Sequence, residues 1–253
     1  MRKKAFLLIV LGIILAFTSC EKSDSKDEQS PDMSINLQQG LVLNYTFDEG
    51  PRTTDVKSVV DYSRSGVHGV VEGNADNLTD TPNGKGYAIR LNKDDYINIP
   101  QYVLQGCQDL SMNIWIKDYT QGWLLASIKP GVVTPSLGIN NSDKIVYNGR
   151  TNYIFAPNVS IYRSNGWHMI SLTSEYVGAT QGGAQGALEG KSIISLYIDG
   201  LLMDSQRVWQ DVCSGTSMRI APEAEPMSVD NVRIYSRSLN SEEVRELYYT
   251  ERR

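Results

Sequence analysis

The sequence predicts an all-β domain made of two facing antiparallel sheets, with one short helix at its C-terminal end. Short segments rich in Val, Ile, Tyr and Trp alternate with clusters of Gly, Asn, Asp and Pro from Leu41 to Tyr235, which is the composition of strands separated by turns. Several segments also alternate apolar and polar residues with a period of two, as half-buried strands do. No helical periodicity of useful length precedes the end of the chain, so alternating βαβ folds are excluded.

Eight segments carry this strand composition in chain order. They are Leu41 to Phe47, Tyr87 to Leu91, Tyr96 to Ile99, Leu110 to Ile116, Trp123 to Ile128, Trp167 to Thr173, Ile193 to Ile198 and Val229 to Tyr235. Asp199-Gly200 separates two apolar runs and predicts a hairpin, because both residues tolerate a positive φ. The glycine-rich stretch 178–186 lacks the GK[ST] ending and the following helix of a phosphate-binding loop, so we expect a long connection there.

The final segment has the pattern of an amphipathic helix. Asn240 is the expected N-cap, and Glu243 stands at the capping-box position three residues later. Val244, Leu247 and Tyr248 fall on one face at helical spacing. We therefore expect this helix to pack on the rim of the sandwich.

The first 19 residues have the features of a secretory signal peptide. Basic residues 2–4 precede an apolar run that is too short to span a bilayer comfortably. Leu15 to Cys20 resembles a bacterial lipobox, in which the cysteine becomes the lipidated N-terminus. This implies a lipoprotein of the bacterial cell envelope, in the outer membrane, attached to the membrane only through lipid on Cys20. An ordinary cleaved signal with a chance cysteine is the alternative.

The mature chain divides into a tether and one domain. Residues 20–38 are polar and acidic and predict a flexible tether, similar to the acidic stretches near the lipidated cysteines of Bacteroidetes surface lipoproteins. Residues 39–253, roughly 215 in number, suit one large β domain. Loss of residues 1–19 leaves 21 basic and 29 acidic residues, a net charge of −8. Because basic clusters are also lacking, nucleic acid is excluded as a partner.

Four segments carry motifs in chain order: residues 43–50 (LNYTFDEG), 61–69 (DYSRSGVHG), 165–172 with 196–200 (NGWHMISL and LYIDG), and 229–244 (VDNVRIYSRSLNSEEV). In this order they resemble the LamG-type, concanavalin A-like domains of exported bacterial proteins. Together they cover residues 41 to 249. The resemblance implies a two-sheet antiparallel jelly roll, a fold that carries lectins, adhesion modules, polysaccharide lyases and glycosidases, so function must be argued from the site.

Catalytic patterns are missing from the sequence. Glycosidases need two carboxyl groups flanking the scissile bond, and catalytic members of this fold carry a strand motif resembling E-x-D-x-x-E, which does not occur here. The nearest approach, Glu223 and Glu225, lies between Pro222 and Pro226 and predicts an exposed loop. The two histidines, His68 and His168, fall where the resemblance implies structural roles. No catalytic residue is predicted.

Calcium is the cofactor that the resemblance implies, because loops supply the oxygen ligands it prefers. Carried over residue by residue, the candidate ligands are Asp48, Asp61 and Asp230. The alternative is that Asp61 forms an Asx-turn and Asp230 caps a strand edge.

Sugar-binding modules combine aromatic platforms with amide and charged groups near the loops. Trp123, Tyr147 and Tyr153 lie near predicted turns, and a set of polar residues close by completes the candidate ligand site. This set is Asn140, Asn141 and Arg150. Packing of half-buried aromatic side chains is the alternative.

Cys107 and Cys213 remain once Cys20 carries lipid, and an exported protein meets conditions that permit a disulfide between them. Two separate thiols are the alternative. The sequence as a whole favours a surface-anchored, non-catalytic carbohydrate-binding or adhesion module, whose partner is a glycan or an extracellular or envelope protein. The alternatives are a divergent glycan-cleaving enzyme and a structural subunit of an envelope assembly.

Overall fold

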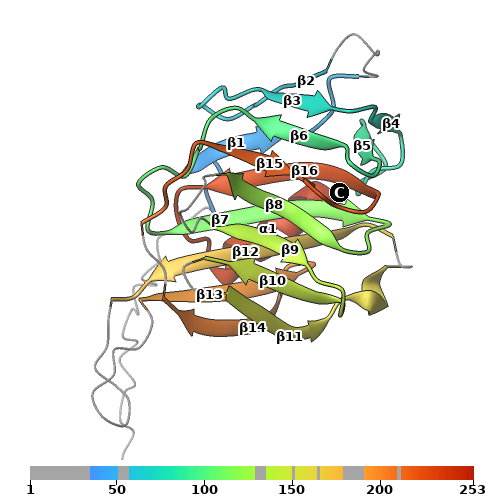
Figure 1. Cartoon of the computed structure of the whole chain (residues 1–253). Helices are drawn as coiled ribbons and strands as arrows, with labels where there is room; N and C mark the ends of the chain where they lie inside the picture. The colour runs from blue at the N-terminus through green and yellow to red at the C-terminus, as the bar shows by residue number, and fades with distance from the viewer. Residues whose placement is uncertain are drawn as a thin grey trace, which may run out of the picture. The chain divides into compact units, whose positions relative to one another are not determined.

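Two antiparallel sheets lie face to face in the computed structural model of the chain (Figure 1). The structure describes residues 35–50, 57–128, 135–149, 152–163, 166–178, 191–209 and 212–253. The predicted signal peptide, most of the tether and Cys20 lie outside the described residues. Ile35 to Arg253 form one compact unit.

Each sheet has eight strands among the described residues. Sheet A contains β1 (Leu41–Tyr45), β4 (Asp76–Leu78), β5 (Ala88–Leu91), β7 (Leu110–Lys117), β12 (His168–Tyr176), β13 (Ser192–Ile198), β14 (Leu201–Val208) and β16 (Met227–Tyr235). Its order is β14-β13-β12-β7-β16-β5-β4, and β1 also pairs with β16. Sequence neighbours β13 and β14 form the hairpin predicted at Asp199 and Gly200, and both residues have positive φ (52° and 77°).

Sheet B forms the opposite layer and faces the viewer in Figure 1. It contains β2 (Ser58–Val59), β3 (Gly69–Glu72), β6 (Tyr96–Ile99), β8 (Gly122–Ile128), β9 (Ser136–Ile139), β10 (Lys144–Asn148), β11 (Asn152–Asn158) and β15 (Ser217–Ile220). Its order is β11-β10-β9-β8-β15-β6-β3-β2. A short 3₁₀ turn, η1 (Ser160–Tyr162), follows β11.

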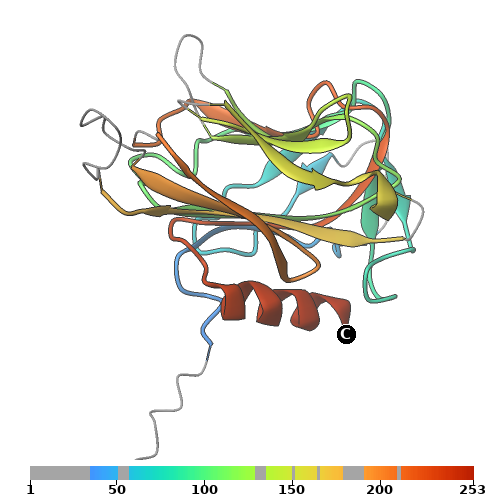
Figure 2. The ribbon, with the colours of Figure 1, turned by 90° about the horizontal axis from the view of Figure 1, so that it is seen from below.

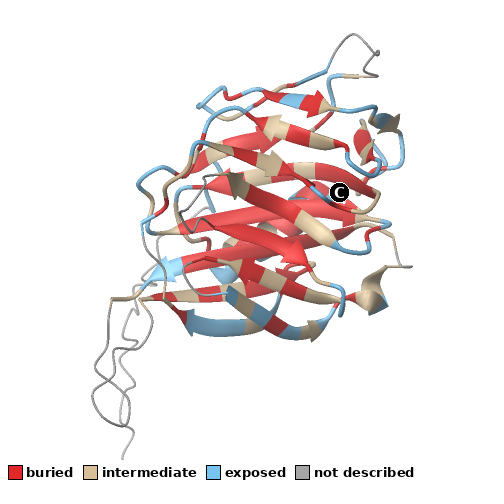
Figure 3. Cartoon of the chain, in the orientation of Figure 1, coloured by how far each residue is buried: buried red, intermediate tan, exposed pale blue. Residues whose placement is uncertain are grey.

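The main core fills the space between the sheets. The inward side chains of the central strands, for example Ile114 on β7, Leu172 on β12 and Leu137 on β9, are fully buried. Figure 3 shows the same pattern, with buried central strands and exposed residues on the outermost strands β14 and β11. Alternation along each strand sends the intervening side chains to the outer faces of the sandwich.

A β-bulge in β16 changes which side chains face outward. Asp230 pairs with Trp115 of β7, whereas Arg233 pairs with Asn113, so two residues of β16, at positions 231 and 232, stand opposite one residue of β7. Asn231 has a φ of 43° at this point. The extra residue places Asp230 and Arg233 on the same outer face of sheet A.

Helix α1 (Ser241–Arg252) covers the outer face of sheet A (Figure 2). Asn240 and Glu243 form the predicted capping box, since the Asn240 side chain accepts from the Glu242 and Glu243 amides and Glu243 accepts from the Asn240 amide. Val244, Leu247 and Tyr248 are buried, as predicted. They form a second apolar cluster with side chains from the sheet, so the helix lies on a sheet face rather than on the predicted rim. The cluster comprises Leu41, Trp115, Met169, Tyr197, Tyr235, Leu239, Val244, Leu247 and Tyr248.

A buried polar network anchors the end of α1. The ring of Tyr248 stacks on that of Trp115, with centroids 5.5 Å apart and planes 14° apart. Glu251 accepts from Trp115 Nε1 at 2.7 Å and from Arg233 Nε. The side chain of Glu251 is 3% exposed, and this burial raises its pKa although Arg233 and Trp115 lower it.

The predicted fold class, an all-β antiparallel sandwich with one C-terminal helix, is confirmed. All eight predicted strands are present. Several short strands were not predicted individually, among them β9, β10 and β11. None of the helices in the described parts of the chain has the length and apolar character needed to cross a membrane.

Candidate functional site

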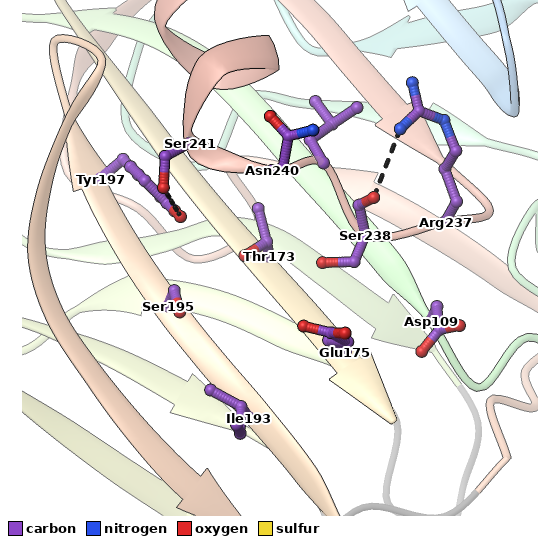
Figure 4. Close-up of a pocket in the computed structure, with 11 residues that line it drawn as sticks. Asp109, Thr173, Glu175, Ile193, Ser195, Tyr197, Arg237, Ser238, Asn240 and Ser241 are labelled. Carbon is purple, nitrogen blue, oxygen red and sulfur yellow. Dashed lines mark hydrogen bonds between the residues drawn. The ribbon is translucent and has the colours of Figure 1, made fainter. Parts of the chain in front are cut away.

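A pocket of about 430 Å³ opens on the outer face of sheet A, where the connection from β16 enters α1. Four separate parts of the chain enclose it (Figure 4). Its lining consists of Asp109, Thr173, Glu175, Ile193, Ser195, Tyr197, Arg237, Ser238, Leu239, Asn240 and Ser241. A volume of this size is in the range of small-molecule sites.

The floor of the pocket consists of outward side chains from two neighbouring strands. Thr173 of β12 is paired with Ser195 of β13. Tyr197, two residues beyond Ser195, therefore lies on the same face, and its hydroxyl is 3.1 Å from that of Ser241 at the start of α1. Ser195 Oγ is 3.0 Å from Ser205 Oγ on β14. The floor thus presents hydroxyl groups beside one aromatic ring.

The wall formed by residues 237–241 is held to the sheet by Ser111. The hydroxyl of this fully buried serine accepts from the Leu239 amide at 2.8 Å and donates to the Arg237 carbonyl at 2.9 Å. Together with the capping box, these bonds fix both ends of the connection. The wall is consequently formed before any ligand arrives.

Arg237 is the only basic residue in the lining among the residues that the structure describes, and its guanidinium is fully engaged. It lies 2.7 Å from Glu243 Oε1 and donates to Glu243 Oε2 at 2.8 Å. It also donates to the Gln39 and Ser238 carbonyls. Burial raises the pKa of Glu243, but bonds from Arg237 and the Asn240 amide lower it more, so the net pKa lies below its ordinary value and the pair is ionised.

Two carboxylates lie at the other end of the pocket. Figure 4 shows Asp109 and Glu175 near one another, away from Tyr197 and Ser241. Asp109 Oδ1 accepts from the Tyr176 amide at 2.6 Å, which fixes its side chain, while Glu175 is exposed. The hydroxyl groups of the floor and the carboxylates of the rim can donate hydrogen bonds to a polyhydroxylated ligand and accept hydrogen bonds from it.

The polar floor continues beneath the helix. Ser171 is the next outward residue of β12, and it is paired with Tyr197 on one side and Asn113 on the other. Ser171 and Asn113 are fully buried, and the Ser171 hydroxyl and both amide atoms of Asn113 have no hydrogen-bond partner. Such groups cost free energy when they stay unpaired.

The predicted ligand residues lie on sheet B, away from this pocket. Trp123 is half-buried on the outer face, where its indole covers Gly138 so closely that an added Cβ would come within 2.8 Å of the ring. Tyr147 is 1% exposed and points into the core, so it is not available to stack on a sugar. Tyr153 is paired with Tyr147 and packs edge-to-face on Phe155 at 5.0 Å. Packing explains both tyrosines.

The predicted polar partners form a turn. The Asn140 side chain accepts from the Ser142 and Lys144 amides at 2.9 and 3.0 Å, so it shapes the β9–β10 turn. Asn141 is exposed in that turn, and Arg150 lies outside the described residues. Sequence reasoning missed the pocket because its lining comes from distant segments, and only the cap signal at Asn240 pointed there.

The candidate calcium ligands separate into two places. Asp61 is buried, and each of its carboxylate oxygens accepts two hydrogen bonds, from the amides of Asn44, Ser63 and Val67 and the hydroxyl of Ser63, all at 2.8 Å. Four such bonds use the lone-pair sites of a carboxylate. The Asx-turn alternative therefore accounts for Asp61, which does not fit as a metal ligand.

Asp48 and Asp230 lie in one neighbourhood. Burial raises the pKa of Asp230 to about 9 in spite of a hydrogen bond from the Asn231 amide, and the carboxylates of Asp48 and Glu251 raise it further. Asp48 Oδ1 accepts from the Tyr87 amide at 3.0 Å and lies where a Cβ on Gly86 would be. A hard cation would suit this pair, although no group of three or more His, Cys, Asp or Glu within the described ranges could hold a metal ion.

Both histidines make hydrogen bonds that hold the fold together. His68 Nδ1 accepts from the Asp61 amide at 3.0 Å, and His168 Nδ1 lies 2.6 Å from Asp199 Oδ2 next to the β13–β14 turn. Neither lines the pocket.

Cys107 and Cys213 are neighbours that the structure holds as thiols. The Cys213 amide donates to the Cys107 carbonyl at 2.8 Å. Burial is the main cause that raises the pKa of nearby Tyr102, and the Cys213 side chain is the second. Burial also raises the pKa of the Cys107 thiol. The predicted disulfide stays a prediction, now between two adjacent chain segments.

Comparison with known proteins supports the fold. No family model matches the chain, and no curated protein matches it. Among solved structures, the receptor-binding domain of the botulinum neurotoxin C/D mosaic serotype superposes with a TM-score of 0.61 at 17% identity. The type C neurotoxin, whose cell entry is described as dependent on two ganglioside molecules, gives 0.62 at 14%. The neurotoxin DC binding domain in complex with SialylT gives 0.61 at 15%.

These matches cover 85% of this chain and 52% of each matched chain, so this chain spans about half the length of the solved chains that it resembles. At such identities the likeness shows the β-sandwich fold alone.

Proposed function

We propose that this chain is a non-catalytic carbohydrate-binding or adhesion module, and that the pocket beside α1 is its glycan site. The observation that carries the proposal is a pocket of about 430 Å³ whose floor places the hydroxyls of Thr173 and Ser195 beside the ring of Tyr197. Hydroxyl and carboxylate groups bind sugar hydroxyls, and a tyrosine ring offers an apolar surface with a polar end.

The structural neighbours support this class of function. One is described as depending on gangliosides for cell entry, one as a complex with SialylT and a third as a complex with rat synaptotagmin II. A glycan or a protein is therefore the class of partner that we propose for this chain. The four sequence motifs further support a LamG-type assignment.

We also propose attachment to the bacterial outer membrane through lipid on Cys20, supported by the lipobox-like sequence before it. Substitution Cys20→Ala is expected to move the protein from the membrane fraction to the soluble fraction. Its retention in the membrane fraction would contradict this attachment.

Calcium is the proposed structural cofactor, held by Asp48 and Asp230 with backbone oxygens. A bound cation would supply the positive charge that keeps the buried Asp230 carboxylate ionised. Asp61 is left out of this site because its oxygens are fully hydrogen-bonded.

The test of the glycan site is array binding by the full-length chain, followed by affinity measurement for the best glycan with two variants. Ser195→Trp fills the pocket and is expected to weaken binding at least tenfold, while Trp123→Ala on the opposite face should leave the affinity within twofold. Circular dichroism would verify that both variants fold.

The opposite pattern, in which only Trp123→Ala abolishes binding, would assign recognition to sheet B. Binding to no glycan would contradict the proposed function. Release of shorter saccharides during incubation would instead support the glycan-cleaving alternative, with Asp109 and Glu175 as the carboxyl pair to test.

A further inference from the structure

We propose that the pocket selects uncharged or amine-bearing saccharides and discriminates against saccharides that carry a carboxylate, such as sialylated or uronic forms. This inference rests on the proposed glycan-binding function. Asp109 and Glu175 stand at one end of the pocket, and no free cation among the described lining residues balances them. An anionic ligand would therefore meet like charge as it enters.

Arg237 does not supply the missing positive charge. Its guanidinium is paired with Glu243 through both carboxylate oxygens and also donates to carbonyl groups of the surrounding chain. A ligand carboxylate would have to displace Glu243, which is partly buried and also caps the helix. The arginine is part of the wall and not a recognition group.

The start of α1 is similarly occupied. Helix N-termini attract anions through their free amide groups and the helix dipole. Here the amides of Glu242 and Glu243 donate to the Asn240 side chain, and the Asn240 amide donates to Glu243. The capping box thus occupies three amide donors at the start of α1 that could otherwise hold a carboxylate.

The floor favours ligands rich in neutral hydroxyls, because its polar groups are the hydroxyls of Thr173 and Ser195. Ser171 and Asn113 lie on the same outward face one row beyond Thr173, but they are fully buried and do not belong to the lining. A second charged group on the ligand would lose hydration at this neutral floor.

Arg207 is a rival source of positive charge beside the lining. Arg207 lies on β14 and is paired with the lining residue Ile193 of β13, so it stands one strand away from the pocket. Its side chain already makes an interaction. If it governed recognition, acidic saccharides would be preferred and substitution of Arg207 would remove the preference.

The experiment compares matched saccharide pairs that differ only in one charged group, with the full-length chain immobilised through its N-terminal region. An array should contain neutral glycans beside their sialylated and uronic counterparts, and N-acetylated amino sugars beside the free amines. We expect acidic members to bind about fivefold more weakly than their neutral partners, the size that exposed charge pairs give. Free amines should bind as well as the N-acetylated forms or better.

Glu175→Gln should reduce this discrimination to less than twofold, and 0.5 M NaCl should reduce it as well because exposed charges are screened. Glu72→Gln removes the same charge from the outer face of sheet B and should leave the discrimination unchanged. Preference for acidic members, abolished by Arg207→Ala, would overturn the inference while leaving the glycan-binding function intact. Failure to bind any saccharide would overturn the proposed function itself.

Discussion

The two outer faces of the sandwich differ in what covers them. The face of sheet A is covered by α1, which buries Trp115, Met169 and Tyr197 in a second core. On sheet B, Ile154, Val146, Gly138 and Trp123 stand in register across four strands, and Ile154 is 57% exposed. The helix therefore buries part of the face of sheet A in a second apolar core and leaves a pocket where the chain enters the helix.

The covered face also carries a group of buried ionisable side chains. Arg233, Glu251 and Asp230 are buried or nearly so beneath or beside the helix, whereas the described polar residues of sheet B's outer face are at least partly exposed, Ser136 being an exception at 5%. Buried charges cost desolvation free energy unless they are paired. Stability of this protein should therefore depend on the helix side far more than on the opposite side.

The largest effect is expected for Glu251→Ala. The substitution leaves the Arg233 guanidinium and the Trp115 indole without their buried acceptor, and it should reduce the free energy of unfolding by about 3–5 kcal/mol. For a domain of this size that corresponds to roughly 10 °C in melting temperature. Glu242→Ala, an exposed position on the same helix, is the matched control. Equal losses for both variants in thermal denaturation would show that the network is dispensable.

The pH dependence of stability should report on Asp230. Its folded pKa of about 9 lies above the unfolded value of 3.8, so its stabilising contribution is complete below about pH 4. The contribution is lost as the pH rises toward 9, at up to about 1.4 kcal/mol per pH unit. Asp230→Asn should flatten this decline, and an equally steep decline in that variant would assign it to other groups.

The effect of added calcium on stability is a second test of the site at Asp230. If Asp48 and Asp230 hold the ion, calcium at roughly 100 times its Kd should add about 2.7 kcal/mol at pH 8, and EDTA should remove the gain. Asp61→Ala should destabilise the loop but keep the calcium response, whereas Asp48→Ala should lose the response. A melting temperature unchanged between millimolar calcium and EDTA would contradict the cofactor proposal.

The smallest effect is expected on sheet B. Ile154→Ala removes a side chain that is mostly exposed, so the free energy of unfolding should change by no more than about 0.5 kcal/mol. Leu247→Ala, in the covered apolar cluster, should cost about 2–4 kcal/mol. Chemical denaturation of the two variants side by side measures the contrast directly. Similar losses would indicate that sheet B's outer face is covered by a partner in solution.

Local patterns in the sequence were enough for most of the fold. Period-two alternation located the strands, and Asp199-Gly200 and Asn240 with Glu243 located the hairpin and the helix start. The inward position of Tyr147 was also readable, since Ile145 and Tyr147 share one face of a short alternating segment. This alternation predicts the direction of the Tyr147 side chain better than the position of Tyr147 near a predicted turn does.

The pocket and the metal neighbourhood depend on long-range placement. Asp109, Thr173, Ser195 and Ser238 are brought together only by the order of strands in sheet A and by the helix that crosses it. Asp48 meets Asp230 in the same way. Nothing in the local sequence distinguishes Asp61, whose oxygens are consumed by its own turn, from a carboxylate that remains available.

The bulge in β16 makes this strand sensitive to length as well as to residue type. Strict alternation would send either Asp230 or Arg233 into the core between the sheets, because residues three apart face opposite ways in a regular strand. Loss of the bulge at unchanged length would therefore exchange the two faces for half of the strand and detach the helix from its anchor, whereas deletion of Asn231 would leave the two residues two apart and keep both on the outer face. Variation among related sequences should therefore retain either a spacing of three with a bulge or a spacing of two without one.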